Sequence, residues 1–218
     1  MNRLILLRHG QSVWNKKNIF TGWVDIPLSQ EGIEEALEAG RTIQDWPIDC
    51  IYTSTLIRGM MTAMLAMNVH KSGKIPEILH NDEENFKDWY RCWDDQTKVE
   101  LIPVKCAWQL NERMYGQLQG KNKQQVREEF GEPQVQIWRR SFAVAPPEGE
   151  SLKMTAERTI PYFETEILPQ LKMGKNVLIV AHGNSLRSIV MKLDRLSEEE
   201  VLQLEIPTGK PLVYAYPF

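Results

Sequence analysis

Two segments of the chain place a histidine and a glycine directly after an apolar run. Residues 4–7 lead into Arg8, His9 and Gly10, and residues 177–181 lead into His182 and Gly183. Short continuous apolar runs are typical of buried parallel strands. The carboxyl ends of such strands form the edge at which open α/β sheets bind ligands. The sequence therefore predicts that two imidazoles meet in one crevice, although most of the chain separates them.

The rest of the chain alternates between strand-like and helical patterns. Further strands are expected at 48–53 and 211–216. Helices are expected from a Ser29 cap to Pro47, from Ser54 or Thr55 to about 67, and at 123–130, 134–140, 151–171, 183–193 and from 197. This alternation predicts an α/β fold, a three-layer sandwich in which helices flank a mainly parallel sheet. The length of 218 residues fits a single domain, 1–218.

Residues 70–105 break this alternation. Isolated aromatic residues there are interrupted by acidic clusters, and no clean period is present. We expect an insertion at about 70–105 that forms a surface excursion from the domain. Within it, Phe86, Trp89, Tyr90 and Trp93 repeat at helical spacing, which predicts a short amphipathic helix.

Charge and composition exclude several classes of protein. The formal net charge of −3 argues against a general grip on nucleic acid. Cys50, Cys92 and Cys106 form no CxxC pattern, so neither a disulfide framework nor a zinc ribbon is expected, and a reducing cytoplasm is the default location. No run approaches the roughly 20 apolar residues of a membrane span.

The two histidines and the nearby arginines indicate phosphate chemistry. A neutral imidazole is a nucleophile toward phosphorus, and a second histidine with Arg8 and Arg58 could hold the transferring oxygens. A metal site is disfavoured because Arg8 would repel the cation and no HExxH spacing occurs. Residues 183–187 nearly match the GxSxG motif of esterases, but Arg187 replaces the last glycine. An esterase is therefore also disfavoured. For a single such histidine, a purely structural role as a buried polar group is the better interpretation. Two histidines at equivalent strand ends, with arginines nearby, favour a shared phosphate site instead.

Several longer motifs resemble those of the histidine phosphatase superfamily, and specifically its 2,3-bisphosphoglycerate-dependent phosphoglycerate mutases. The signature segments are RHGQSVWN at 8–15, FTGW at 20–23, YTS at 52–54 with Arg58, LNERMYG at 110–116, GKNK at 120–123, WRR at 138–140, HGNSLR at 182–187 and IPTG at 206–209. They cover nearly the whole chain outside 70–105. The RHG triplet is common to the superfamily, whereas NERMYG and WRR are far more specific to the mutases.

The resemblance implies a histidine-phosphatase-like fold and a role for each matching residue. His9 would carry the phosphoryl group, Glu112 would exchange protons with the substrate hydroxyls, and Arg8, Arg58 and His182 would hold the group in transfer. The implied substrate-binding residues are Arg8, His9, Gly10, Gln11, Ser12, Val13, Trp14, Asn15, Thr21, Gly22, Arg58, Glu112, Arg113, Met114, Tyr115, Lys123, Arg139, Arg140, Gly183 and Asn184.

The implied activity is the glycolytic and gluconeogenic interconversion of 3-phosphoglycerate and 2-phosphoglycerate, primed by 2,3-bisphosphoglycerate and needing no metal. Small phosphoglycerates are the expected partners, with neither nucleic acid nor a membrane, and a homodimer is usual in the family. Two departures keep a phosphomonoesterase or bisphosphoglycerate phosphatase open as the alternative. The chain stops at Phe218, where relatives carry a longer tail, and residues 146–151 form a shorter loop. A less covered phosphohistidine meets water more often. A non-catalytic phosphometabolite-binding protein is the more distant alternative.

Overall fold

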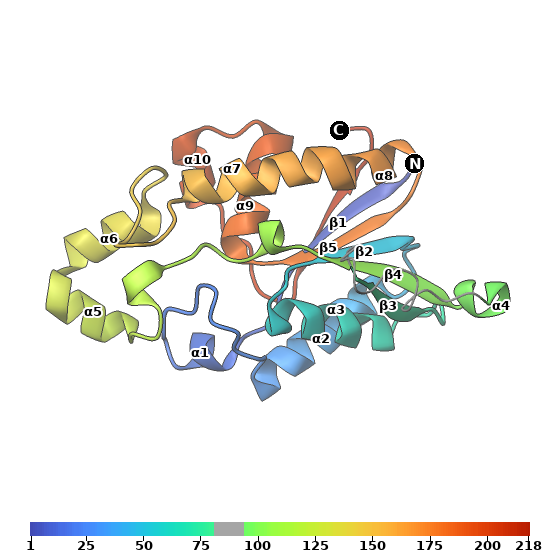
Figure 1. The fold of residues 1–218 in the computed structure, drawn as a ribbon, viewed down its shortest axis with the longest axis horizontal. Coiled ribbons are helices and arrows are strands. Elements are labelled where there is room, and N and C mark those ends of the chain that lie inside the picture. The colour runs from blue at the N-terminus through green and yellow to red at the C-terminus, as the bar shows by residue number, and fades with distance from the viewer. Residues whose placement is uncertain (81–93) are drawn as a thin grey trace.

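A computed structural model describes residues 1–80 and 94–218 (Figure 1). The strands of its one described sheet are β1 (Arg3–Arg8), β2 (Cys50–Thr53), β3 (Ile75–Leu79), β4 (Leu101–Cys106), β5 (Val177–Ala181) and β6 (Pro211–Ala215). Their order is β3-β4-β2-β5-β1-β6, and only β6 runs antiparallel to its neighbour. The prediction of a mainly parallel α/β sheet is confirmed.

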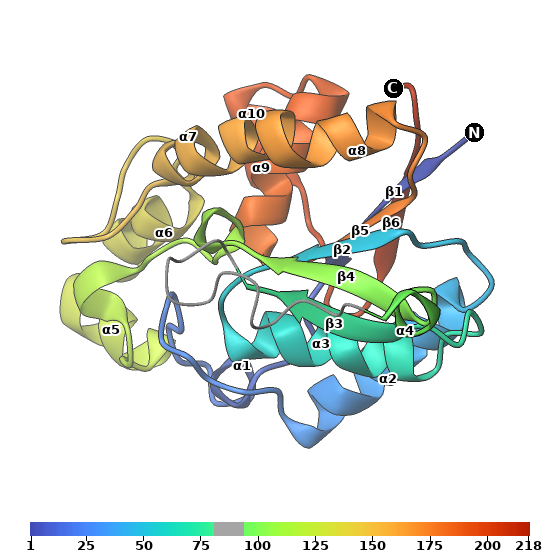
Figure 2. The same ribbon diagram turned by 45° about the vertical axis from the view of Figure 1, so that its right-hand side comes forward.

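Helices cover both faces of this sheet (Figure 2). The helical segments are α1 (Val13–Lys16), α2 (Gln30–Ile43), α3 (Ile57–Asn68), α4 (Asp95–Lys98), η1 (Trp108–Leu110), η2 (Gly116–Leu118), α5 (Lys123–Phe130), α6 (Glu132–Arg140), α7 (Leu152–Tyr162), η3 (Phe163–Ile167), α8 (Leu168–Lys172), α9 (Gly183–Asp194) and α10 (Glu198–Gln203). Helices α2 and α3 lie on one face, and α7 to α9 lie on the other.

The two faces of the sheet bury separate apolar cores, because successive strand residues point in opposite directions. Leu4 and Leu6 of β1 pack with Phe163 and Ile189 on the α7–α9 side. The intervening Ile5 and Leu7 pack with the helices of the other side. Alternate burial on both faces explains why β1 and β5 are apolar at consecutive positions.

The segment between α3 and η1 corrects one prediction. Residues 75–79 and 101–106 are strands of the main sheet, so a surface excursion is wrong for both. Each contains a proline, Pro76 and Pro103, which normally argues against a strand inside a sheet. Pairing between β2 and β4 begins at Val104, after Pro103. The amphipathic helix expected around residues 86–93 lies outside the described residues, and the extent of an insertion at 70–105 stays a prediction.

Two smaller helix predictions also differ from the structure. The single helix expected at 151–171 is divided into α7, the π-helical turn η3 and α8. Pro161 and Pro169 lie in this stretch and cannot donate backbone hydrogen bonds. Helix α3 is not capped by Ser54 or Thr55, because its N-cap is Leu56 and no side chain caps it.

The first loop is wedged tightly against α2. A Cβ atom on Gly10 would collide with the carbonyl of Gly32, and a Cβ on Gly32 would collide with the carbonyl of Gln11. Both positions therefore require glycine, since only glycine permits such close backbone approach. This contact fixes the backbone immediately after His9.

Candidate active site

A cavity opens where β1 and β5 end, between the sheet and the α5–α6 pair. Parallel pairing of β1 with β5 brings Arg8 opposite Ala181, so the two His-Gly segments follow side by side. The lining residues are Arg8, His9, Asn15, Ile19, Phe20, Thr21, Gly22, Arg58, Glu112, Arg113, Tyr115, Lys123, Arg139, Arg140, Gly183, Asn184, Arg187, Glu205 and Ile206. Seven of them are arginine or lysine and two are glutamate, so the cavity suits a small ligand with several negative charges.

His9 is buried at the inner end of this cavity, with 3% of its surface exposed. Its Nδ1 lies 2.6 Å from the carbonyl oxygen of Gly10. A carbonyl only accepts hydrogen bonds, so Nδ1 carries the proton and Nε2 keeps its lone pair. Burial, together with the charges of Arg58 and Arg8, holds the pKa of His9 well below its ordinary value of 6.5. His9 is therefore a neutral imidazole whose Nε2 is available as a nucleophile.

His182 lies beside His9, with 4.8 Å between the ring centroids and 58° between the planes. Its Nε2 is 2.8 Å from the Ser54 hydroxyl, while the buried Nδ1 has no hydrogen-bond partner within the described part of the chain. Burial and the nearby charge of Arg58 also hold the pKa of His182 well below its ordinary value. His182 is therefore a second buried imidazole in direct contact with His9.

Two arginines flank the histidine pair and are themselves held by backbone carbonyls. Arg58 is 1% exposed and donates to the carbonyls of Gly22 at 2.7 Å and Val24 at 3.0 Å. Burial lowers its pKa to about 10, which leaves it charged at neutral pH. Arg8 donates to the carbonyl of Ile206 at 2.8 Å, and its guanidinium packs over Gly183. Both guanidinium groups are thus oriented before any ligand binds.

Glu112 provides the carboxylate at this end of the cavity. Its Oε1 accepts the Arg113 amide at 2.7 Å, the Asn184 amide at 3.2 Å and the Asn184 side chain at 2.8 Å. No bond to Oε2 is found among residues 1–80 and 94–218. Burial alone would raise the pKa of Glu112, but these bonds and the charges of Arg8 and Arg58 bring the pKa below its ordinary value. Glu112 is therefore ionised and presents one free oxygen.

The outer part of the cavity carries a second group of cations on α5 and α6. Burial and neighbouring cations, Arg139 among them, lower the pKa of Lys123, although Tyr115 opposes this shift. Burial likewise lowers the pKa of Arg139. Arg113 is buried over the ring of Tyr115, at 4.8 Å from its centroid. This second group lines the same cavity as Arg8 and Arg58 and is suited to bind a further anionic group of the same ligand.

Most of the residues predicted from the sequence lie in this cavity. His182 is buried just behind His9 rather than in the cavity wall. Six of the predicted binding residues are not in the wall either: Gly10, Gln11, Ser12, Val13, Trp14 and Met114. Ser12 caps α1 through a reciprocal pair of bonds with Asn15, and thereby fixes Asn15, which does line the cavity.

The structure adds five wall residues that the sequence analysis did not select: Ile19, Phe20, Arg187, Glu205 and Ile206. Helical spacing could have identified Arg187, because it lies four residues after Gly183 on α9 and therefore on the same face. Glu205 bonds Arg140 at 2.8 Å and lies 3.5 Å from Arg187. No local pattern marks Glu205, since both partners are distant in the sequence.

Within residues 1–80 and 94–218, no cluster of three histidine, cysteine, aspartate or glutamate residues is placed to hold a metal ion. None of the helices in these ranges is both long and apolar enough to cross a membrane.

Comparison with known protein families identifies the superfamily of the chain. Residues 4–97 and 91–215 match the model of the histidine phosphatase superfamily, branch 1. The chain belongs to this superfamily. A protein from Chlamydia pneumoniae named 2,3-bisphosphoglycerate-dependent phosphoglycerate mutase is 62% identical over 216 residues, which cover 99% of this chain and 94% of the relative. A protein of the same name from Protochlamydia amoebophila (strain UWE25) is 60% identical over 99% of this chain and 96% of its own length.

Solved structures share the fold at much lower identity. A structure titled mycobacterial hydrolase 1 superposes with a TM-score of 0.76 at 21% identity, covering 100% of this chain and 92% of that one. A mycobacterial glucosyl-3-phosphoglycerate phosphatase gives 0.74 at 22% identity, covering 97% and 89%. These matches support the fold alone, whereas the relatives near 60% identity confirm the resemblance to the mutases.

Proposed function

We propose that this chain is a 2,3-bisphosphoglycerate-dependent phosphoglycerate mutase that interconverts 3-phosphoglycerate and 2-phosphoglycerate through a phosphohistidine on His9. The observation that carries the proposal is one cavity that holds both the Nε2 lone pair of His9 and the free carboxylate oxygen of Glu112. A mutase needs both groups, because it must bind the phosphoryl group and also activate the hydroxyl that receives it. Relatives of that name near 60% identity support the same conclusion.

The first transfer starts from phosphorylated His9. The ionised Glu112 takes the proton of the free hydroxyl of a monophosphoglycerate as that oxygen attacks phosphorus. The bond between phosphorus and His9 Nε2 breaks, and its electron pair returns to the ring. Arg8, Arg58 and the adjacent His182 stabilise the charge on the phosphoryl oxygens during transfer. The product of this step is the bisphosphate, with the proton held on Glu112.

The second transfer reverses these roles on the other phosphate. The bisphosphate reorients within the cavity so that its second phosphoryl group faces His9. Nε2 then attacks phosphorus, the phosphorus–oxygen bond breaks, and the leaving oxygen takes the proton from Glu112. The enzyme is again phosphorylated, and the isomeric monophosphate is released. No metal is needed in this scheme, because fixed guanidinium groups provide the positive charge.

The outer cations fit 2,3-bisphosphoglycerate as the primer. This molecule carries two phosphates and a carboxylate, so one end can be held at the histidine pair while the rest requires further cations. Lys123, Arg139 and Arg140 line the outer part of the same cavity. Guanidinium bonds to phosphate are charge-assisted and contribute about 1.5–3 kcal/mol each.

A two-product assay tests this function. One purified preparation is incubated with 3-phosphoglycerate, with and without priming by 2,3-bisphosphoglycerate, and both 2-phosphoglycerate and inorganic phosphate are measured. Isomer formation that depends on priming is expected to dominate. Inorganic phosphate as the main product would reject the mutase in favour of a phosphatase, and binding of the primer without labelling of His9 would indicate a non-catalytic protein.

We further propose a cytoplasmic location and a homodimer. Phosphoglycerates are intermediates of glycolysis, and the described cysteines, Cys50 and Cys106, are free thiols, as a reducing compartment would keep them. The mass of the purified protein by light scattering tests the dimer.

A further inference from the structure

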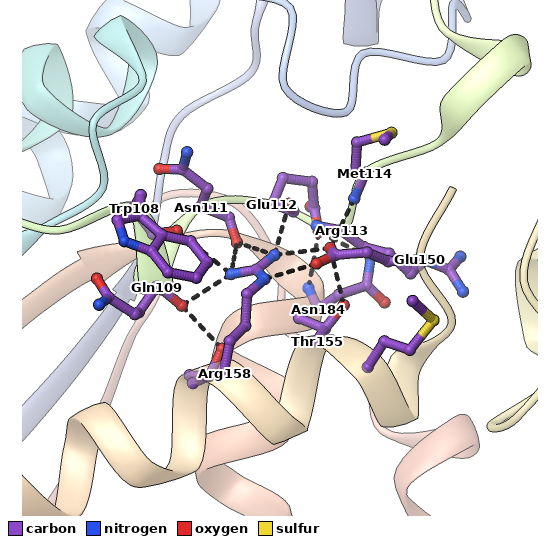
Figure 3. Close-up of polar contacts among 12 residues, drawn as sticks. Trp108, Gln109, Asn111, Glu112, Arg113, Met114, Glu150, Thr155, Arg158 and Asn184 are labelled. Atoms are coloured by element: carbon purple, nitrogen blue, oxygen red, sulfur yellow. Dashed lines mark hydrogen bonds and ion pairs between the residues drawn. The ribbon is translucent and has the colours of Figure 1, made fainter. Parts of the chain in front are cut away.

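Glu112 lies in a segment whose backbone is held by one buried guanidinium. The structure shows Arg158 of α7 donating to the carbonyls of Gln109 at 2.8 Å, Asn111 at 3.1 Å and Glu112 at 2.9 Å (Figure 3). The carbonyl of Trp108 is a weaker acceptor at 3.4 Å. The Arg158 guanidinium alone thus hydrogen-bonds several backbone carbonyls in the segment that ends at Glu112.

Arg158 is itself fixed by a bidentate ion pair. Its Nε and Nη2 donate to the two carboxylate oxygens of Glu150 at 2.8 and 2.9 Å. Only 8% of the Arg158 side chain and 16% of the Glu150 side chain are exposed. Parallel bonds of this kind constrain the plane of the guanidinium as well as its distance. The group therefore has little freedom to follow a shift of the backbone that it holds.

The Arg158–Glu150 pair fixes the backbone on both sides of Glu112 in the sequence: Arg158 bonds residues before it, and Glu150 bonds Met114 after it. Glu150 accepts the Met114 amide at 3.0 Å, and its own amide donates to the Met114 carbonyl at 2.7 Å. Trp23 donates its indole N–H to the same Glu112 carbonyl oxygen as Arg158, and the Arg158 guanidinium lies over its ring, 5.4 Å from the centroid. Residues 111–114 are consequently held by Arg158, Glu150 and Trp23 together.

Arg158 does not line the cavity, so it acts through other residues: its guanidinium holds the backbone of Glu112, and its charge makes a minor contribution to the lowered pKa of His182. A buried ion pair often adds little net stability when compared with apolar side chains of the same size. Its effect on geometry can be much larger, because a misplacement of about 1 Å costs on the order of 100-fold in rate. We propose that Arg158, locked by Glu150, is a positioning residue that holds the Glu112 carboxylate in register with the oxygen that receives or gives up the proton.

This inference rests on the proposed role of Glu112, and a change of leaving group tests it. His9 is phosphorylated either by 2,3-bisphosphoglycerate or by p-nitrophenyl phosphate, in single-turnover experiments. The first donor releases a strongly basic oxygen, and its departure needs a proton from Glu112, which is ionised in the free enzyme and takes that proton up from solvent when the bisphosphate binds. The second releases p-nitrophenolate, which is a far weaker base and leaves without that proton. A loss confined to the first donor therefore reports on proton transfer rather than on folding or phosphate binding.

The Arg158→Gln enzyme should phosphorylate His9 from 2,3-bisphosphoglycerate about 100-fold more slowly, and from p-nitrophenyl phosphate less than about 5-fold more slowly. Glu112→Gln should show the same split, and the double variant should lose little more than Glu112→Gln alone. Arg41→Gln, which removes a guanidinium from the exposed pair with Glu38, is the matched control and should match the wild type with both donors.

Equal losses with the two donors, or additive losses in the double variant, would overturn the positioning role. Glu150→Gln replaces Arg158→Gln if the latter does not fold, because it removes the clamp on Arg158 and keeps its charge; the same split is expected. These outcomes are independent of the mutase proposal. A wild-type enzyme that mainly releases inorganic phosphate would reject that proposal, whereas the donor split would still decide the role of Arg158.

Discussion

The inner and outer ends of the cavity are built in different ways. At the inner end, His9, His182 and Arg58 are buried and are fixed largely by backbone carbonyls or a neighbouring hydroxyl. At the outer end, Arg140 pairs with Glu205, whose side chain is 65% exposed. Buried groups held by the main chain cannot adjust, while exposed ion pairs are screened by solvent and exchange partners easily. The inner end is therefore suited to chemistry, and the outer end to binding ligands in more than one orientation.

Removal of the proposed nucleophile, His9, should cause the largest loss of activity, because the inner end then lacks the group that accepts the phosphoryl group. His9→Ala is expected to abolish both phosphoenzyme formation and mutase turnover, because the described wall offers no second imidazole in an equivalent position. Incorporation of radiolabelled phosphate from 2,3-bisphosphoglycerate measures the first, and a coupled isomerase assay measures the second. Residual labelling of His9→Ala would place the covalent carrier elsewhere; circular dichroism confirms that the variant is folded.

Glu112→Gln keeps the shape of the inner end and removes only its proton exchange. Turnover of 3-phosphoglycerate should fall about 100- to 10,000-fold, the range typical of general acid–base catalysis. The bonds from Arg113 and Asn184 can still reach the amide oxygen, so binding should change little. The measurement is a comparison of kcat and KM. A rise in KM with unchanged kcat would contradict the assigned role.

The buried histidines should make stability depend on pH. Because burial and Arg58 hold the folded-state pKa of His9 and of His182 below 6.5, the unfolded chain binds more protons as the pH falls through 6.5. The free energy of unfolding should therefore decrease below that pH, by at most about 1.4 kcal/mol per pH unit for each histidine, and level off above it. Urea denaturation at pH 7.5 and 5.5 measures this slope.

Replacement of one buried histidine isolates its share of this slope. His182→Asn should reduce the difference in unfolding free energy between pH 7.5 and 5.5 relative to the wild type. An unchanged difference would mean that His182 titrates alike in both states. His80→Asn, a substitution outside the cavity wall, provides the comparison.

The outer end should respond more weakly to the loss of a cation. Arg140→Gln is expected to raise KM for 3-phosphoglycerate about 10-fold, equivalent to about 1.4 kcal/mol, with kcat nearly unchanged. The bond from Arg140 to Glu205 shows that this guanidinium already reaches the cavity mouth. A larger loss in kcat than in KM would mean that the outer cations also stabilise the transition state.

The smallest expected effect is a decrease in KM, opposite to the increase expected for Arg140→Gln. Glu205 neutralises part of the charge of Arg140 and Arg187 at the mouth. Glu205→Gln should lower KM by a few-fold at low salt, and the gain should disappear near 0.5 M salt, where exposed charges are strongly screened. If the gain persists at high salt, Glu205 acts by shape rather than by charge.

Different parts of this site were accessible to sequence reasoning for different physical reasons. The strands that carry His9 and His182 were predictable because both faces of β1 and β5 are buried, so every residue in the run is apolar. Strands β3 and β4 were missed because the segment shows no clean apolar period: β3 is partly exposed, and each strand contains a proline. The clamp by Arg158 was not predictable, since its acceptors lie 46 to 49 residues away and are carbonyl groups that every residue possesses.

The close contact between Gly10 and Gly32 couples His9 to α2, a helix that contributes no residue to the described cavity wall. The orientation of the His9 ring follows the peptide plane of Gly10, through the bond from Nδ1. That plane in turn rests on the first turn of α2. A methyl group added at Gly32 would collide with the backbone of Gln11, and the shift that this forces would reach the peptide between Gly10 and Gln11. The direction in which His9 Nε2 points therefore depends on how α2 packs against the first loop. Substitutions that change this packing should change that direction.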